Sequence, residues 1–170
     1  MTRSDDAPAG GSATGTAATV AALPGSGPSA AETWLRIVQV HDRITHRVDS
    51  AMHQKHGLSL TGFEALRRIA DAPGERASMG EVAEAVGLSR PGVTSTVGRL
   101  VADGLVVRER ADGDRRLLHA RLTPAGRQRV DEAARTHDDL VAHLLILLGD
   151  DAAAVTDALA RVSRAARTRR

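Results

Sequence analysis

The part of the chain that most constrains its fold lies between residues 78 and 122, where two helical patterns and a hairpin pattern follow one another. The first helix is predicted by an apolar stripe at i, i+3, i+4 and i+7, which consists of Met79, Val82, Ala83 and Val86. Gly87 should end this helix, because glycine adopts the left-handed conformation that a sharp stop requires. Leu88 follows as an apolar contact between the two helices.

The second helix is predicted to begin at Ser89, which can cap its first turn, and Pro91 falls where a missing N–H costs nothing. The apolar residues that continue inward are Val93, Val97, Leu100 and Val101. The opposite face consists of Arg90, Thr94, Ser95, Gly98 and Arg99. Small hydrogen-bonding side chains with flanking arginines suit a helix that enters a DNA major groove. An ordinary pair of packed helices is the alternative for this segment alone.

After this helix the sequence changes to the period of a β-hairpin. Asp103-Gly104 forms a second helix stop, and residues 105–110 and 115–122 are predicted to be strands joined by a turn at 111–114. Thr123-Pro124 supplies an N-cap and a first-turn proline. A long helix is therefore expected to start directly after the hairpin.

The hairpin and the start of the next helix are strongly basic. Residues 105–130 contain seven arginines against three acidic residues. An arginine-rich hairpin beside a groove-reading helix suits a DNA minor groove, where narrow stretches concentrate negative potential. The alternative is a solvated edge that charge protects from aggregation, since charged residues have that role in many sheets.

The stretch from Leu58 to Gly126 resembles the MarR family of winged helix-turn-helix bacterial transcription regulators. The segments that carry the resemblance are LSLTGFEALRRIA, MGEVAEAVGLSRPGVTSTVGRLVADGLVVRER, DRR at 114–116 and LTPAGR at 122–127. A weaker similarity covers residues 31–165. The resemblance implies a mainly α (α+β) fold, in which a winged helix-turn-helix with a two-stranded β wing is flanked by N- and C-terminal dimerisation helices.

The resemblance also implies a homodimer that binds double-stranded DNA at a short palindrome, most often as a repressor that a small molecule releases. Asp114 matches the wing aspartate that orients an arginine, and Arg115 and Arg116 match the DNA-contacting pair. The expected DNA-binding residues are Ser89, Arg90, Pro91, Thr94, Ser95, Arg99, Asp114, Arg115 and Arg116. Many relatives carry an arginine after the threonine of the recognition helix, whereas this chain has Ser95 there. The wing turn is also shorter than the common form, so the operator sequence does not follow from the resemblance.

The expected domain organisation has two parts. Residues 1–29 are rich in Ala, Gly, Ser, Thr and Pro and cannot bury enough apolar surface to order themselves, so a flexible tail is expected. The remainder is a MarR-type domain over 30–167, with a dimerisation helix at 30–56, a DNA-binding core at 60–122 that includes the wing at 105–122, and dimerisation helices at 123–167.

Apolar stripes outside the core predict self-association. Trp34, Ile37, Val38, His41, Ile44, Val48 and Met52 keep a helical rhythm over a first helix too long for a small winged core to cover. The run from Leu140 to Leu148 and the last helix after Gly149-Asp150 are also apolar, so exposing them all would leave a large associating patch. The segment from Asp131 to Asp157 contains seven acidic residues and one arginine. This negative charge suits a dimerisation end of the molecule that is held away from DNA phosphates. A larger monomeric bundle is the alternative.

Effector and metal sites are less clearly marked. Family resemblance implies a ligand cleft, often for aromatic acids, and we expect it to be bordered by Trp34, His41, Phe63 and His137. Asp42 and His46 are four residues apart, and His53 and His56 are three apart. Both are spacings of metal ligands on one face of a helix. No cluster of carboxylates and histidines surrounds these pairs, so neither a metal site nor a cofactor is expected, and a metal-responsive regulator of the same fold is the alternative.

Composition and motifs exclude several other classes. The chain has no cysteine, which rules out disulfides and a thiol-based switch. No apolar run approaches the ~20 residues of a membrane span. We therefore expect a cytoplasmic location and no membrane partner. Gly87 to Pro91 comes near the nucleophile elbow of hydrolases but ends in proline and lacks the preceding strand, so an enzyme is not expected. A winged helix used only for protein docking stays open.

Overall fold

The computed structural model describes residues 27–111 and 114–167, except the side chains of residues 111–117 and 167. The chain divides into two units, Met1–Val40 and His41–Arg170. Helix α1, Ala30–His56, begins in the first unit and ends in the second. Its length matches the expected first helix, and in the second unit its inward face is buried at Val48 and Met52.

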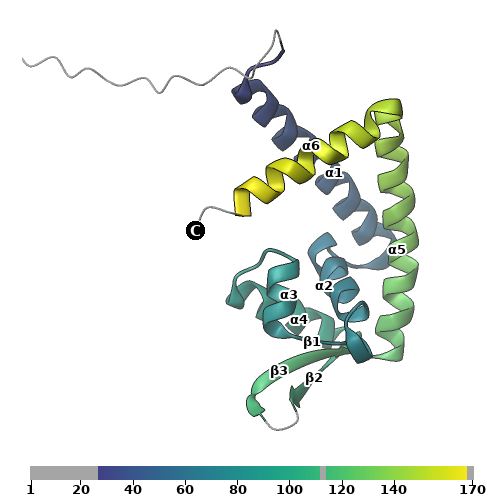
Figure 1. Ribbon diagram of the computed structural model, residues 1–170. Coiled ribbons are helices and arrows are strands. Elements are labelled where there is room, and N and C mark those ends of the chain that lie inside the picture. Colours follow the sequence, from purple (N-terminus) through teal and green to yellow (C-terminus); the bar gives the residue numbers. More distant parts are fainter. Residues whose placement is uncertain (1–26, 112–113, 168–170) are drawn as a thin grey trace, which may run out of the picture. The chain divides into compact units, whose positions relative to one another are not determined.

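The second unit is mainly helical with one small sheet (Figure 1). After α1 its elements are α2 (Leu60–Ala70), the 3-10 turn η1 (Pro73–Glu75), β1 (Arg76–Ser78), α3 (Met79–Ala85), α4 (Arg90–Ala102), β2 (Val106–Ala111), β3 (Asp114–Leu122), α5 (Pro124–Leu145), the 3-10 turn η2 (Ile146–Asp151) and α6 (Ala152–Arg167). This is the expected α+β winged-helix architecture, with each predicted helix present.

The sheet has three antiparallel strands in the order β1-β3-β2. Val106 pairs with Leu122 at the base of the hairpin, and Ala77 of β1 pairs with Ala120 on the other side of β3. The sequence predicted the hairpin but not β1. A three-residue strand is too short to show an alternating pattern, and it becomes a strand only because β3 offers it hydrogen bonds.

One hydrophobic core joins the helices to the sheet. Its largest fully buried side chains come from α1, α2, α3, α4 and β2, and they are Phe63, Met52, Leu66, Ile69, Val48, Val82, Val93, Val97 and Val106. Val101, which was expected to face inward, is 36% exposed, whereas Thr96 is only 4% exposed. The inward stripe of α4 therefore runs through positions 93, 96, 97 and 100, and Val101 lies beyond its edge because each residue turns the helix by about 100°.

The junction between the wing and α5 sets the position of the hairpin. The Thr123 amide donates to the Leu105 carbonyl (3.1 Å), and its hydroxyl donates to the Gly104 carbonyl (2.8 Å). The same hydroxyl accepts the Gly126 amide (3.0 Å) and so caps α5. A Cβ atom at Gly126 would overlap the Leu105 carbonyl oxygen, so only glycine allows α5 to approach the wing this closely.

We predict that Gly126→Ala lowers the free energy of unfolding by about 2 kcal/mol or more, because backbone of the wing junction must move to admit the methyl group. Thermal and denaturant unfolding measure the change. Gly80→Ala is the matched control, since a Cβ there meets nothing nearer than the Ser78 hydroxyl at 3.9 Å. The control should be neutral or stabilising, as expected for a glycine in an exposed helical turn. Equal stability of the two variants would contradict the close-approach argument.

Candidate nucleic-acid interface

Helix α3 and the turn after it are held by local hydrogen bonds. The Ser78 hydroxyl accepts the Glu81 amide, and the Glu81 carboxylate accepts the Ser78 amide at 2.8 Å, which together form a capping box. The hydrogen bond from the Ser78 backbone holds the pKa of Glu81 below its ordinary value. Gly87 has φ +64° and Leu88 donates to the Ala83 carbonyl, so the predicted glycine stop is confirmed.

Helix α4 begins where the sequence predicted it. The Ser89 hydroxyl accepts the Gly92 amide at 3.4 Å, and Pro91 lies in the first turn. Val93, Val97 and Leu100 are buried in the core. The residues of this helix that the sequence predicted to bind DNA all lie on the opposite side and are exposed, namely Ser89, Arg90, Pro91, Thr94, Ser95 and Arg99. A helix anchored on one side therefore presents one continuous polar and basic face to solvent.

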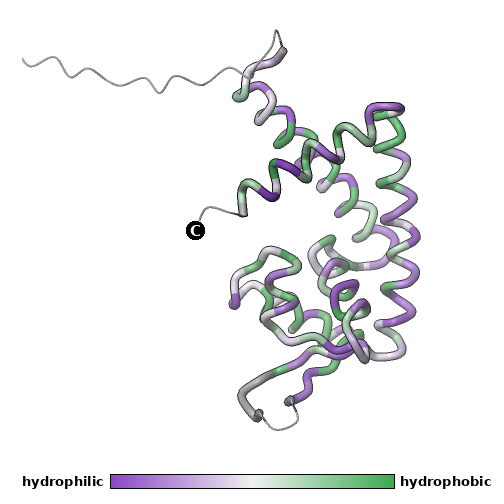
Figure 2. Tube along the Cα trace, viewed as in Figure 1, coloured by the Kyte–Doolittle hydropathy of each residue, from purple (hydrophilic) through white to green (hydrophobic). Residues whose placement is uncertain are grey.

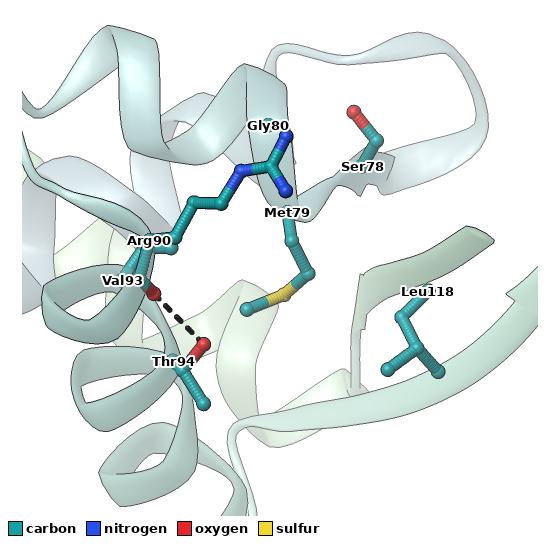
Figure 3. A pocket seen from close by; sticks show the side chains of 7 residues that line it. All are labelled: Ser78, Met79, Gly80, Arg90, Val93, Thr94 and Leu118. Atoms are coloured by element: carbon teal, nitrogen blue, oxygen red, sulfur yellow. Dashed lines mark hydrogen bonds between the residues drawn. The ribbon is translucent and has the colours of Figure 1, made fainter. Parts of the chain in front are cut away.

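A hollow of about 360 Å³ opens at the N-terminal end of this face, between α3, α4 and β3 (Figure 3). Its walls are Ser78, Met79, Gly80, Arg90, Val93, Thr94 and Leu118. The Thr94 hydroxyl donates to the Arg90 carbonyl at 2.9 Å, drawn as a dashed line in Figure 3. Its hydrogen is therefore engaged, and toward a base edge the oxygen acts as an acceptor while the methyl group offers an apolar contact.

The arginines of this unit differ in their partners. Some are paired with carboxylates, as Arg121 is with Glu109 and Arg127 is with Glu75. The hydrogen bond from Arg121 holds the pKa of Glu109 below its ordinary value. Among the described residues Arg90, Arg99 and Arg110 have no such partner, and all three are exposed. Exposed cations without an acidic partner are available for an external anion such as a phosphate.

One contact of this surface was missed by sequence reasoning. Arg108 of β2 donates through Nη2 to the carbonyl of Thr94 on α4 at 3.1 Å. The sequence pattern counted Arg108 only among the charges of the wing. No local signal could have found the contact, because its two partners belong to different elements that only the tertiary fold brings together.

Arg115 and Arg116 lie on β3, as the hairpin pattern predicted, whereas Asp114, which was expected in the turn, is the first residue of that strand. Their side chains lie outside the described residues. Their roles toward DNA therefore stay predictions.

The residues expected to border a ligand cleft lie at several places. His41 helps to line a hollow of about 560 Å³, whose other walls are Asp42, Thr45, His46, Asp49, Leu60, Thr61, Glu64 and Val86. Phe63 is only 1% exposed and belongs to the core, where its ring centroid lies 5.1 Å from that of His137. Trp34 belongs to the first unit, on the N-terminal half of α1, and is exposed. Phe63 and His137 thus contact one another but do not line the hollow that contains His41.

The histidine pairs with metal-ligand spacing are engaged differently. His56 Nε2 lies 2.9 Å from the Thr136 hydroxyl, and His53 lies 3.8 Å from Asp49. Burial is the main cause that lowers the pKa of His56. Within the described residues no group of three or more histidine, aspartate or glutamate side chains could hold a metal ion. In the same part of the chain, no helix has the length and apolar character that a membrane crossing requires.

Two helices that meet at a glycine turn, an exposed polar and basic face on the second helix and an adjoining antiparallel hairpin define a winged helix-turn-helix DNA-binding protein. Residues 56–117 match the sequence profile of the MarR family. No curated protein matches the chain.

Solved structures give the same result over most of the chain. AbsC from Streptomyces coelicolor, a MarR family transcriptional regulator, is 27% identical with a TM-score of 0.73 over 81% of this chain and 93% of AbsC. Sco3205 from the same organism, solved in complex with DNA, is 22% identical with a TM-score of 0.73 over 79% of this chain and 88% of its own. BpsR from Bordetella bronchiseptica is 21% identical with a TM-score of 0.60 over 75% and 98%.

The chain is therefore similar to the MarR family over residues 56–117 in sequence and over most of its length in fold, and the members of that family are DNA-binding transcriptional regulators and not enzymes. The sequence-based recognition and the exclusion of an enzyme are therefore confirmed.

The two groups of arginines predict different effects on stability. Arg127 donates to Glu75, which has φ +55°, and to the Ala70 carbonyl at 3.2 Å. We expect Arg127→Gln to lower the free energy of unfolding by about 1 kcal/mol, allowing for partial exposure of the ion pair. Arg90→Gln and Arg99→Gln should change it by less than about 0.5 kcal/mol. Urea denaturation measures all three, and a large loss at Arg90 or Arg99 would show that these residues support the fold.

Proposed function

We propose that the protein is a homodimeric repressor that binds a short palindromic promoter site. The α4 helices of the two subunits enter successive major grooves, and the two wings reach the flanking minor grooves. The observation that carries the proposal is the exposed face of α4, on which the unpaired Arg90 and Arg99 flank Thr94 and Ser95. Repression follows if the bound dimer covers a promoter and excludes the polymerase.

Each residue of the interface has a proposed role. Arg90 and Arg99 bind phosphates or guanine edges at the two ends of α4. Thr94 acts as an acceptor, so it favours adenine N6 or cytosine N4, and its methyl group favours thymine. Ser95 reads a base edge, while Ser89 and Pro91 bring the first turn of α4 close to the backbone. Asp114 orients Arg115 and Arg116 toward the minor groove.

Self-association is supported by apolar side chains that one chain leaves in water. Near the end of α5 and in η2 the exposed residues include Leu145, Ile146 and Leu147, the last of them 87% exposed, and Figure 2 shows this hydrophobic stretch. Leu159 and Val162 of α6 are exposed as well. A second copy of the chain that covers such a patch gains the free energy of burying it. Two copies also match the two-fold symmetry of a palindrome.

We propose that a small aromatic acid releases the protein from DNA by binding in the hollow that His41 helps to line. DNA binding by the structural relative BpsR is regulated by 6-hydroxynicotinic acid. In this chain the hollow beside His41 includes Glu64, and burial raises the pKa of that carboxyl. A carboxyl that is more easily neutralised repels an acidic ligand less.

The proposed DNA contacts are tested by selecting bound sequences from a random pool and measuring affinity for the selected site at several salt concentrations. We expect a palindrome with half-sites about one helical turn apart. Replacing Arg115 and Arg116 with alanine should weaken binding to all sequences and reduce the salt slope by about one unit per lost phosphate contact. Thr94→Val and Ser95→Ala should instead change base preference. If the protein only docks other proteins, no DNA sequence will be selected. If the selected sequences contain a single half-site and no palindrome, the proposed dimer is contradicted.

The effector proposal is tested with salicylate and 6-hydroxynicotinic acid as probes. Binding to the folded protein should raise the melting temperature and weaken affinity for the selected site. His41→Ala should reduce both effects, whereas His143→Ala, at an exposed position of α5, should not. No shift in melting temperature and no loss of DNA affinity with either probe at saturation would contradict the proposal.

A further inference from the structure

We infer that Arg108 is a positioning residue for DNA reading, which holds the wing at a set angle to α4 by binding the backbone of that helix, and that Gly98 provides the space for it. This inference rests on the proposed DNA-binding function. It concerns two residues that the interface described above does not assign to contact with DNA. Arg108 forms a hydrogen bond with the Thr94 carbonyl, and its guanidinium lies next to Gly98.

The hydrogen bond joins the two elements that must engage different grooves. Arg108 lies on β2 opposite Ala120 of β3, and its Nη2 donates to the Thr94 carbonyl at 3.1 Å. A carbonyl within a helix already accepts the amide four residues later, and its second lone pair can accept a further donor. Arg108 uses this second acceptor site. The contact therefore ties the base of the wing to the backbone of Thr94, the residue whose hydroxyl lies on the reading face.

Gly98 explains how the arginine reaches the helix. Glycine within a helix is unfavourable compared with alanine, so its place in the middle of α4 needs a local reason. A Cβ built at Gly98 would meet Nη2 of Arg108 at 3.4 Å. Apart from the neighbouring residues and the backbone of the same helix, no other heavy atom lies within 4 Å of that position. A methyl group here would lie against the guanidinium at the short end of ordinary van der Waals contact, and a larger side chain would push the guanidinium away from the carbonyl. The glycine thus leaves room for the arginine.

The neighbours of Arg108 on the strand have other engagements. Glu109 on the opposite face of β2 is paired with Arg121 across the sheet. Arg110 shares the face of Arg108, because side chains alternate along a strand, but it has no partner among the described residues. Arg110 therefore serves as a comparison for Arg108: it is the same residue type on the same strand and face, but it is free to bind a phosphate and has no bond to α4.

A fixed angle between wing and helix affects recognition in a way that a phosphate contact does not. If α4 sits in the major groove, the angle decides whether the wing reaches the minor groove beside it. Loss of the Arg108 contact should therefore weaken the contacts that the wing makes through Arg115 and Arg116. Affinity should then fall, and this loss should disappear in a variant that already lacks Arg115 and Arg116, because both changes act through the wing.

The test uses the full chain and the DNA site selected by the wild-type protein. Arg108→Met removes the donors and keeps the stem. It should weaken binding about tenfold and reduce footprint protection at the wing-contacted flanks, and it should cause no further loss in a variant whose Arg115 and Arg116 are alanine. Arg110→Met, which removes an exposed cation without a bond to α4, should instead add its loss to that of the wing pair. Gly98→Leu should weaken binding about fivefold without lowering the melting temperature, whereas Gly98→Ala should have little effect. The Gly98→Leu/Arg108→Met double variant should bind no more weakly than Arg108→Met alone, because both act through one contact.

Three results would overturn the inference. Additive losses of Arg108→Met and of the replacement of Arg115 and Arg116 would make Arg108 a phosphate ligand in its own right. Additive losses in the Gly98→Leu/Arg108→Met variant would mean that Gly98 acts by its own contact with DNA. Unchanged affinity in Arg108→Met would mean that the wing keeps its angle without this bond. Failure of the proposed function is a separate outcome, because the wild-type protein would then select no DNA site.

Discussion

The burial of one side of α4 is the constraint on which the rest of the interface depends. Val93, Val97 and Leu100 lie in the core, so the helix cannot rotate about its axis without exposing them to water. Because that side of the helix is buried, the face with Arg90, Thr94, Ser95 and Arg99 must point outward. The DNA-binding surface is thus a consequence of core packing, and the same apolar contacts that stabilise the domain select which side chains can reach a groove.

The wing depends on a second set of contacts, which are made by backbone atoms. Thr123 donates to both carbonyls at Gly104 and Leu105, and Gly126 lets α5 approach them. Arg108 adds a bond from β2 to the Thr94 carbonyl. The hairpin is therefore tied at its base to the helix after it and to the recognition helix before it. The position of the wing therefore depends on both of these helices.

The candidate site was predictable where its signals are local. Ser89 and Pro91 mark the start of α4, and the positions of Thr94, Ser95 and Arg99 on its outer face follow from helical period alone. Sequence reasoning failed for Val101, at the edge of the apolar stripe, because the width of a buried face depends on what packs against it. It also placed Phe63 at a cleft, whereas the residue is in the core against His137.

Sequence by itself determined the elements and their order, since a glycine stop, a serine cap or a proline in a first turn acts on its neighbours through backbone geometry that does not depend on distant residues. The tertiary structure alone decided the third strand at Arg76–Ser78, the bond from Arg108 to Thr94 and the overlap that excludes a side chain at Gly126. Each of these joins segments far apart in the chain. Their existence depends on distances that folding creates, and no local pattern of residues encodes such a distance.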